Sequence, residues 1–106
     1  MSRAASLPTS VNKTPTEGAR FLLERERDEG ASAVYKAAIY TPDATYEGTA
    51  VLRDDGSISV ELTAPADLAD MLAMLAKLTA RAAAKKREDG LPPWPARVMR
   101  WRGPGR

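Results

Sequence analysis

The side chains of this sequence that could do chemistry are carboxylates, amines, guanidinium groups and hydroxyls, because the chain contains no cysteine and no histidine. Histidine is the commonest general base and metal ligand near neutral pH, and cysteine is the usual soft ligand. Their absence excludes disulfides and thiolate metal sites. No serine or tyrosine stands beside a recognisable activating base, and no glycine-rich phosphate loop is present. We therefore expect a non-catalytic protein without a cofactor or a bound metal.

The densest carboxylates do not change this expectation. Asp54 and Asp55 lie in the sequence RDDGS, which is typical of a hairpin turn in which aspartate accepts local hydrogen bonds. A hard cation would need more oxygen ligands converging on it. The alternating charges of ERERDE, residues 24–29, are typical of a solvated surface.

The most unusual segment is GLPPWPARVMRWRGPGR, residues 90–106, which holds both tryptophans and four of the eight prolines. It also lies in a basic part of the chain. Residues 17–76 carry five basic and twelve acidic side chains, whereas residues 77–106 carry nine basic and two acidic ones. The segment has three interpretations: a strap that closes the core, a ligand for a partner, or a contact for nucleic acid.

As a strap, the segment would leave the preceding helix and cross an open edge of the core. Trp94 would then fill that edge, since tryptophan is highly buried on average. Residues 96–102 would add an edge strand with Met99 and Trp101 on one face and Val98 on the other.

As a partner ligand, LPPWPAR matches the pattern of polyproline segments that bind aromatic grooves. The basic segment could also dock on an acidic protein or on the acidic part of a second copy, which makes a homodimer an alternative. The candidate partner-binding residues are Trp94, Arg97, Arg100, Trp101 and Arg102.

A nucleic acid is the alternative partner, because arginine binds phosphate with two hydrogen bonds and indole can stack on bases. The candidate phosphate contacts are Lys77, Arg81, Lys85, Lys86 and Arg87. Basic residues also gather at the end of a helix for electrostatic reasons, and the acidic body would repel a duplex laid across it.

These side chains must be positioned by a sheet and a helix. Three antiparallel strands are predicted, at residues 32–41, 45–53 and 57–62, from β-branched content and alternation. A two-residue loop at Pro42–Asp43 sets Tyr35 opposite Ala50. A three-residue loop at residues 54–56 sets Ala50 opposite Val60, on the same face.

Residues 20–27 fit either a strand or a helix. The strand is favoured, because RDEGA resembles RDDGS and both predict a three-residue hairpin loop. Such a loop at residues 28–30 sets Leu23 opposite Tyr35, again on the apolar face.

A long helix is predicted at residues 65–89 and should end at Gly90 in a left-handed cap. Its apolar stripe should pack on the sheet, where Ala37, Gly48 and Ala50 allow a close approach. The stripe consists of Leu68, Met71, Leu72, Leu75, Leu78 and Ala82. A flanking line of alanines is expected to be exposed, with a helix–helix dimer seam as the alternative. These alanines are Ala69, Ala73, Ala76, Ala80 and Ala84.

The predicted fold is α+β: an antiparallel three- or four-stranded meander with one face covered by a long helix. Residues 1–13 are predicted to be a disordered leader, and TPTE at residues 14–17 a capping box that begins a helix. Residues 14–90 form the domain. Residues 91–106 form an extended basic tail that packs on the domain or projects from it.

The expected function is that of a small non-catalytic protein-binding or adaptor protein, with the tail and the adjoining sheet edge as its interaction surface. The alternative is a nucleic-acid-binding protein that uses the basic helix end and the tail. The longest apolar run, Met71 to Ala76, is too short to span a membrane, and the first residues do not resemble a signal peptide. We therefore expect a cytoplasmic protein without a membrane partner.

Overall fold

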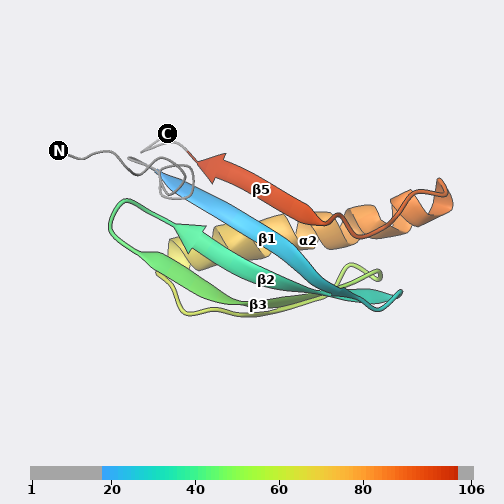
Figure 1. The fold of residues 1–106 in the computed structure, drawn as a ribbon, viewed down its shortest axis with the longest axis horizontal. Coiled ribbons are helices and arrows are strands. Elements are labelled where there is room, and N and C mark those ends of the chain that lie inside the picture. The colour runs from blue at the N-terminus through green and yellow to red at the C-terminus, as the bar shows by residue number, and fades with distance from the viewer. Residues whose placement is uncertain (1–17, 103–106) are drawn as a thin grey trace.

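The computed structural model describes residues 18–102, which form a five-stranded antiparallel sheet and one long helix. The helix runs along one face of the sheet (Figure 1). The elements are β1 (Ala19–Asp28), β2 (Ser32–Tyr40), β3 (Thr45–Arg53), β4 (Ile58–Glu61), α2 (Ala66–Glu88) and β5 (Arg97–Arg102). The order across the sheet is β4-β3-β2-β1-β5, so the chain returns after α2 to pair with β1. The α+β class is confirmed, and β5 adds a fifth strand to the three or four predicted. The predicted leader and capping box lie outside the described residues.

The registers of β3 follow from its two turns, as predicted. Tyr35 lies opposite Ala50, and Ala50 lies opposite Val60. The three-residue turn between β3 and β4 is closed by the amide of Arg53, which donates to the carbonyl oxygen of Ser57 at 3.0 Å. Gly56 in that turn has a φ of 92°, a conformation that glycine adopts without steric cost.

The register of β1 differs from the prediction by two residues. Leu23 lies opposite Ala37 rather than Tyr35. The β1–β2 turn lies further along the chain than predicted, at residues 29–31 rather than 28–30, and the amide of Glu29 donates across it to the carbonyl oxygen of Ser32 at 2.9 Å. Segment 20–27 is nevertheless a strand, as favoured.

A bulge between Arg25 and Arg27 keeps the correct side chains in the core. Beyond the turn, Asp28 lies opposite Ala33, and extending that register along β1 would turn Leu23 to the other face of the sheet. The extra residue shifts the register by one and restores the face. Leu23 is consequently completely buried.

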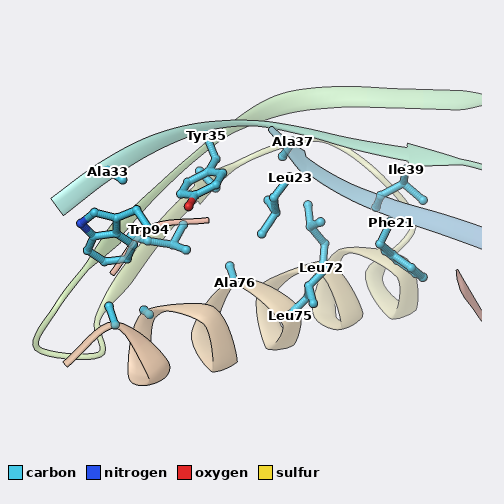
Figure 2. Close-up of a cluster of buried hydrophobic side chains, with 14 of the residues drawn as sticks. Phe21, Leu23, Ala33, Tyr35, Ala37, Ile39, Leu72, Leu75, Ala76 and Trp94 are labelled. Carbon is cyan, nitrogen blue, oxygen red and sulfur yellow. The ribbon is translucent and has the colours of Figure 1, made fainter. Parts of the chain in front are cut away.

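Side chains of complementary size fill the layer between the sheet and α2 (Figure 2). We call this side of the sheet the core face and the opposite side the open face. The first half of α2 contributes Leu72 and Leu75, and its second half buries mainly alanines such as Ala76. Tyr35 and Trp94 supply the bulk there, and both are at most 1% exposed. The small alanines leave room for these two rings between the helix and the sheet, so the layer stays closely packed.

The face of α2 that packs on the sheet is rotated from the predicted stripe. Met71 and Leu78 were expected in the core but are 37% and 46% exposed. Ala76 and Ala80 were expected outside, yet both are completely buried. Two members of the alanine line are therefore part of the core, whereas Ala69 and Ala73 are half-buried and Ala84 is exposed as expected. Trp94, a large side chain that comes from outside the helix, lies in the same buried cluster as these alanines.

The missing side chain at Gly48 allows the segment that follows β4, rather than α2, to approach β3 closely. A Cβ at this position would lie 2.0 Å from the carbonyl oxygen of Glu61 and 2.8 Å from the Cβ of Leu62. The chain leaving β4 thus crosses directly over Gly48 on its way to α2. The missing side chain serves this crossing rather than the packing of the helix.

The end of α2 is a complete Schellman cap, as Gly90 predicted. The amide of Leu91 donates to the carbonyl oxygen of Lys86 at 2.8 Å. The amide of Gly90 donates to the carbonyl oxygen of Arg87 at 3.1 Å. Gly90 has a φ of 74°. This cap reverses the chain toward the sheet.

Replacing Gly48 by alanine tests the crossing. We expect Gly48→Ala to lower the free energy of unfolding by about 1–3 kcal/mol or more, because the added methyl group collides with backbone atoms. Thr49→Ala, on the open face of the same strand, should cost less than about 1 kcal/mol. Urea denaturation measures both. Equal stabilities for the two variants would contradict the close contact.

The two tryptophans provide a matched pair for testing the core. Trp94→Ala should lower the free energy of unfolding by about 3–5 kcal/mol, because it empties a fully buried site. Trp101 is 55% exposed, and Trp101→Ala should change stability by about 0.5 kcal/mol. Guanidinium denaturation followed by circular dichroism gives both values. If Trp94→Ala does not fold, Trp94→Phe should still be less stable than Trp101→Ala. Similar losses in the matched variants would be incompatible with this packing.

Candidate functional site

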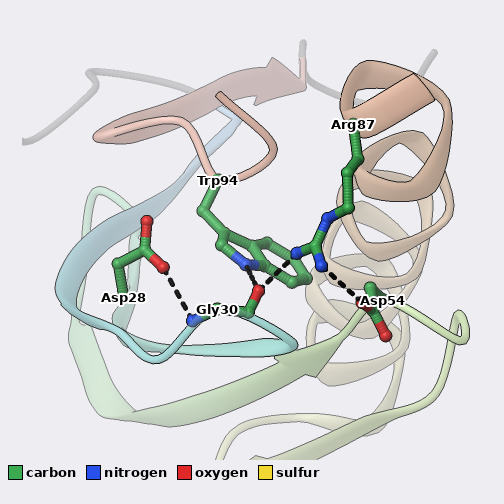
Figure 3. A network of polar contacts seen from close by, with 5 residues as sticks. All are labelled: Asp28, Gly30, Asp54, Arg87 and Trp94. Atoms are coloured by element: carbon green, nitrogen blue, oxygen red, sulfur yellow. Dashed lines mark hydrogen bonds and ion pairs between the residues drawn. The ribbon is translucent and has the colours of Figure 1, made fainter. Parts of the chain in front are cut away.

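Trp94 anchors the segment that connects α2 to β5. Its side chain is 1% exposed, and its Nε1 donates to the carbonyl oxygen of Gly30 at 2.9 Å (Figure 3). The indole thus buries its ring and satisfies its one polar group in the β1–β2 turn. This burial is the one that the strap interpretation predicted. Trp94 was also a candidate partner contact, but at 1% exposure its ring offers a partner almost no surface.

Three further hydrogen bonds fix the backbone just before β5. The Nη1 of Arg25 donates to the carbonyl oxygen of Trp94, and the hydroxyl of Tyr35 donates to that of Pro95, both at 2.7 Å. The amide of Arg25 donates to the carbonyl oxygen of Ala96 at 2.9 Å. The strand therefore starts from a fixed position on the sheet.

Arg87 joins this anchor to the end of the helix. Its guanidinium donates to the carbonyl oxygen of Gly30 and lies 3.2 Å from a carboxylate oxygen of Asp54 (Figure 3). Asp28 in turn accepts a hydrogen bond from the amide of Gly30 at 2.9 Å. Arg87 was a candidate phosphate contact, and here it links two turns of the sheet to α2.

The outer edge of β5 carries unpaired backbone groups within residues 18–102. Ala96 points its carbonyl group at β1, and β5 pairs only with β1. Successive residues of an antiparallel strand alternately point their backbone groups toward and away from a given neighbour. The amides and carbonyls of Arg97, Met99 and Trp101 therefore point away from β1, at the free edge.

A groove of about 270 Å³ lies beside β5, between this strand and α2. We call it the β5 groove; its lining residues are Phe21, Asp70, Met71, Met74, Leu75, Leu78 and Arg100. Met74 is 58% exposed there, beside the partly exposed Met71 and Leu78. These three side chains recur at three- and four-residue steps, so they form a second apolar line on α2 that the sheet does not cover.

The open face of β5 is also apolar at its surface. Met99 lies opposite Leu22, and Trp101 lies opposite Arg20. Met99 and Trp101 are 48% and 55% exposed, whereas Leu22 is buried. This face of β5 was predicted to carry Met99 and Trp101, with Val98 on the other face. That arrangement is confirmed, so apolar side chains flank the free edge on both faces of the sheet.

The three arginines of β5 differ in their partners. Arg97 lies 3.2 Å from Glu24, and Arg102 lies 3.9 Å from Asp67. Arg102 also donates to the sulfur of Met71 at 3.2 Å. Arg100 lies opposite Phe21 and lines the β5 groove. Within the described part of the chain, no carboxylate lies within ion-pair distance of Arg100.

The basic residues of α2 do not form a single patch. Lys77, Arg81 and Lys85 share one line on the helix because they are four residues apart. Lys86 and Arg87 lie progressively further round, by about 100° per residue. Lys85 is also 3.6 Å from Asp89. The structure therefore gathers three of the five predicted phosphate contacts and separates the other two.

The groove was not predicted from the sequence, because Met71 and Leu78 were expected in the core and Met74 was assigned to no surface. The sequence does contain one indication of the groove, which is the width of the apolar surface on α2. Met74 lies beside the predicted stripe and widens it beyond what one sheet face can cover.

Within residues 18–102 there is no cluster of three or more potential metal ligands, and no helix is both long and apolar enough to cross a membrane. Comparisons of the chain with models of protein families, with curated proteins and with solved structures find no match. The geometry of the β5 edge is thus the basis for a functional proposal.

Tyr35 makes the anchor sensitive to alkaline pH. Burial raises the pKa of its hydroxyl from 10.0 to about 12, with a smaller opposing effect from Arg25. Folding therefore favours the neutral hydroxyl that donates to Pro95. This contribution to stability is complete below pH 10 and is lost as the pH rises toward 12.

The comparison of the parent chain with Tyr35→Phe tests this dependence. At pH 8 the variant should be less stable by about 1 kcal/mol, because it lacks the hydrogen bond to Pro95. Between pH 10 and 12 the parent should lose up to about 3 kcal/mol more than the variant. Urea denaturation across this range measures the difference between the two proteins. Parallel pH profiles would contradict the assignment.

Proposed function

We propose that this chain is a small non-catalytic protein-binding module that captures an extended segment of a partner as an additional strand on β5. The observation that carries the proposal is the free edge of β5, with its outward amides bordered by the apolar β5 groove. An edge strand beside a groove formed with a helix is suited to strand addition. Backbone hydrogen bonds would supply affinity, and side-chain sites on either face would supply specificity.

The alternation of side chains along a strand matches the two surfaces beside β5. One set of partner side chains would lie over Met71, Met74 and Leu78 in the groove. The other set would lie beside Met99 and Trp101 on the open face. Binding would therefore cover the large apolar side chains that flank this edge.

The anchor before β5 favours binding energetically. Trp94, Arg25 and Tyr35 hold the backbone of this segment in place through hydrogen bonds of 2.7–2.9 Å. A strand that is already ordered loses little conformational entropy when a partner pairs with it. We therefore narrow the proposed interaction surface from the tail and the adjoining sheet edge to β5 and its groove.

A nucleic acid remains the second candidate, and the line of Lys77, Arg81 and Lys85 is the observation that favours it. Arg97 and Arg102, predicted partner-binding residues, both lie near carboxylates of the same chain. Those carboxylates reduce the positive potential along β5. Binding of a single-stranded oligonucleotide that weakens steeply with salt would support this candidate.

A proline at Met99 tests strand addition directly. Random twelve-residue peptides displayed on phage should yield sequences that bind the intact full-length chain with micromolar affinity. Met99→Pro removes an outward amide without removing a hydrogen bond to β1, so it should weaken these peptides at least tenfold. Met99→Ala, which removes the side chain alone, should weaken them by a smaller factor. Isothermal titration calorimetry measures all three proteins.

Arg100→Pro is the control for the pairing of β5 with β1. The amide of Arg100 points toward β1, so this variant should lower the melting temperature more than Met99→Pro does. Selected peptides that bind the parent and Met99→Pro equally would contradict strand addition. Selection that yields no binding peptide would contradict the proposed function itself.

A further inference from the structure

Arg100 is placed to recognise charge on a partner strand. Its side chain lies on the core face, opposite Phe21, where it forms part of the wall of the β5 groove. The neighbouring arginines, Arg97 and Arg102, lie within 3.9 Å of Glu24 and Asp67, respectively. Arg100 is the arginine of β5 without such a carboxylate among residues 18–102. A strand added to the free edge would place one side chain directly beside it.

A second copy of the chain is a poor source for that strand. β5 contains three arginines and no acidic residue. Pairing two copies of β5 would bring six arginines into one two-stranded ladder, and like charges on neighbouring strands are destabilising. Charged edge strands commonly prevent this kind of self-association. The positive charge of β5 therefore favours pairing with an acidic strand rather than with a second copy of β5.

We propose that the segment captured by β5 carries an acidic side chain opposite Arg100 and an apolar side chain two residues away, over the β5 groove. This inference rests on the proposed function and specifies its ligand. The residue two positions from the acid lies on the same face of the added strand. Opposite Val98, it would meet the apolar line of Met71, Met74 and Leu78.

Asp70 restricts where the acid can lie. Its carboxylate lines the helix side of the β5 groove, whereas Arg100 lines the strand side. A partner carboxylate is attracted to the strand side and repelled from the helix side. A basic side chain at the same position would instead face Arg100 at close range. Arg100 thus favours the acidic side chain, and Asp70 confines it to the strand side of the groove.

Matched peptides test the sign of the charge. The probes are eight-residue peptides in which threonine and valine alternate and one central valine is replaced by Glu, Gln or Lys. For the full-length chain we expect the Glu peptide to bind about 3- to 10-fold more tightly than the Gln peptide, and the Lys peptide to bind most weakly. The difference should shrink in high salt. Calorimetry or the fluorescence of Trp101 reports binding.

A charge reversal assigns this preference to one residue. Arg100→Glu should bind the Lys peptide more tightly than the Glu peptide. Arg81→Glu is the matched control, because it changes the net charge equally but lies near Gly56, beside the β3–β4 turn. It should keep the original order of affinities. Melting curves establish that both variants fold, and Arg100→Gln, which should remove the preference, replaces Arg100→Glu if that variant does not fold.

The outcomes separate this inference from the proposed function. Equal affinities of the Glu and Gln peptides would overturn the charge preference, while phage-selected peptides that still depend on the Met99 amide would leave strand addition intact. A preference that persists in Arg100→Glu would also overturn the inference. If no designed peptide binds, the stated ligand chemistry is wrong, and the phage selection alone then decides the proposed function.

Discussion

The burial of the Trp94 indole against the second half of α2 is the interaction on which the rest of the structure depends. The alanines of α2 leave a space that the ring fills, and the hydrogen bond to Gly30 joins it to the β1–β2 turn. Without this buried ring and its hydrogen bond, residues 91–102 would be held less firmly along β1. The free edge and the β5 groove both exist because the ring fixes the start of β5.

A second constraint is that side chains alternate between the two faces of the sheet. A register shift of one residue in β1 would therefore move its buried side chains to the open face and its exposed side chains into the core. The bulge between Arg25 and Arg27 corrects the register set by the turn and keeps Leu23 under the sheet. The same correction places Arg25 where it can donate to Trp94. One local irregularity therefore serves both the core and the anchor.

The β5 edge combines features that oppose each other in a protein without a partner. Its outward amides, with Met99 and Trp101 beside them, favour association, whereas its three arginines oppose pairing with a second copy. An acidic, extended partner reconciles these features, because it would satisfy the amides, cover the apolar side chains and complement Arg100. This combination is the physical basis of the proposed function.

The sequence by itself determined the strands β2 to β4, their registers, the extent of α2 and its glycine cap, because these depend on turns and periodicity that act over a few residues. It also placed Met99 and Trp101 on one face of an edge strand by alternation. Only the tertiary structure decided which face of α2 is buried, since Ala76 and Ala80 lie in the core with Trp94 whereas Met71 and Leu78 are partly exposed. It likewise decided the bulge in β1 and the groove beside Arg100. These features depend on how volume is shared between segments distant in the sequence, and no local pattern encodes that division.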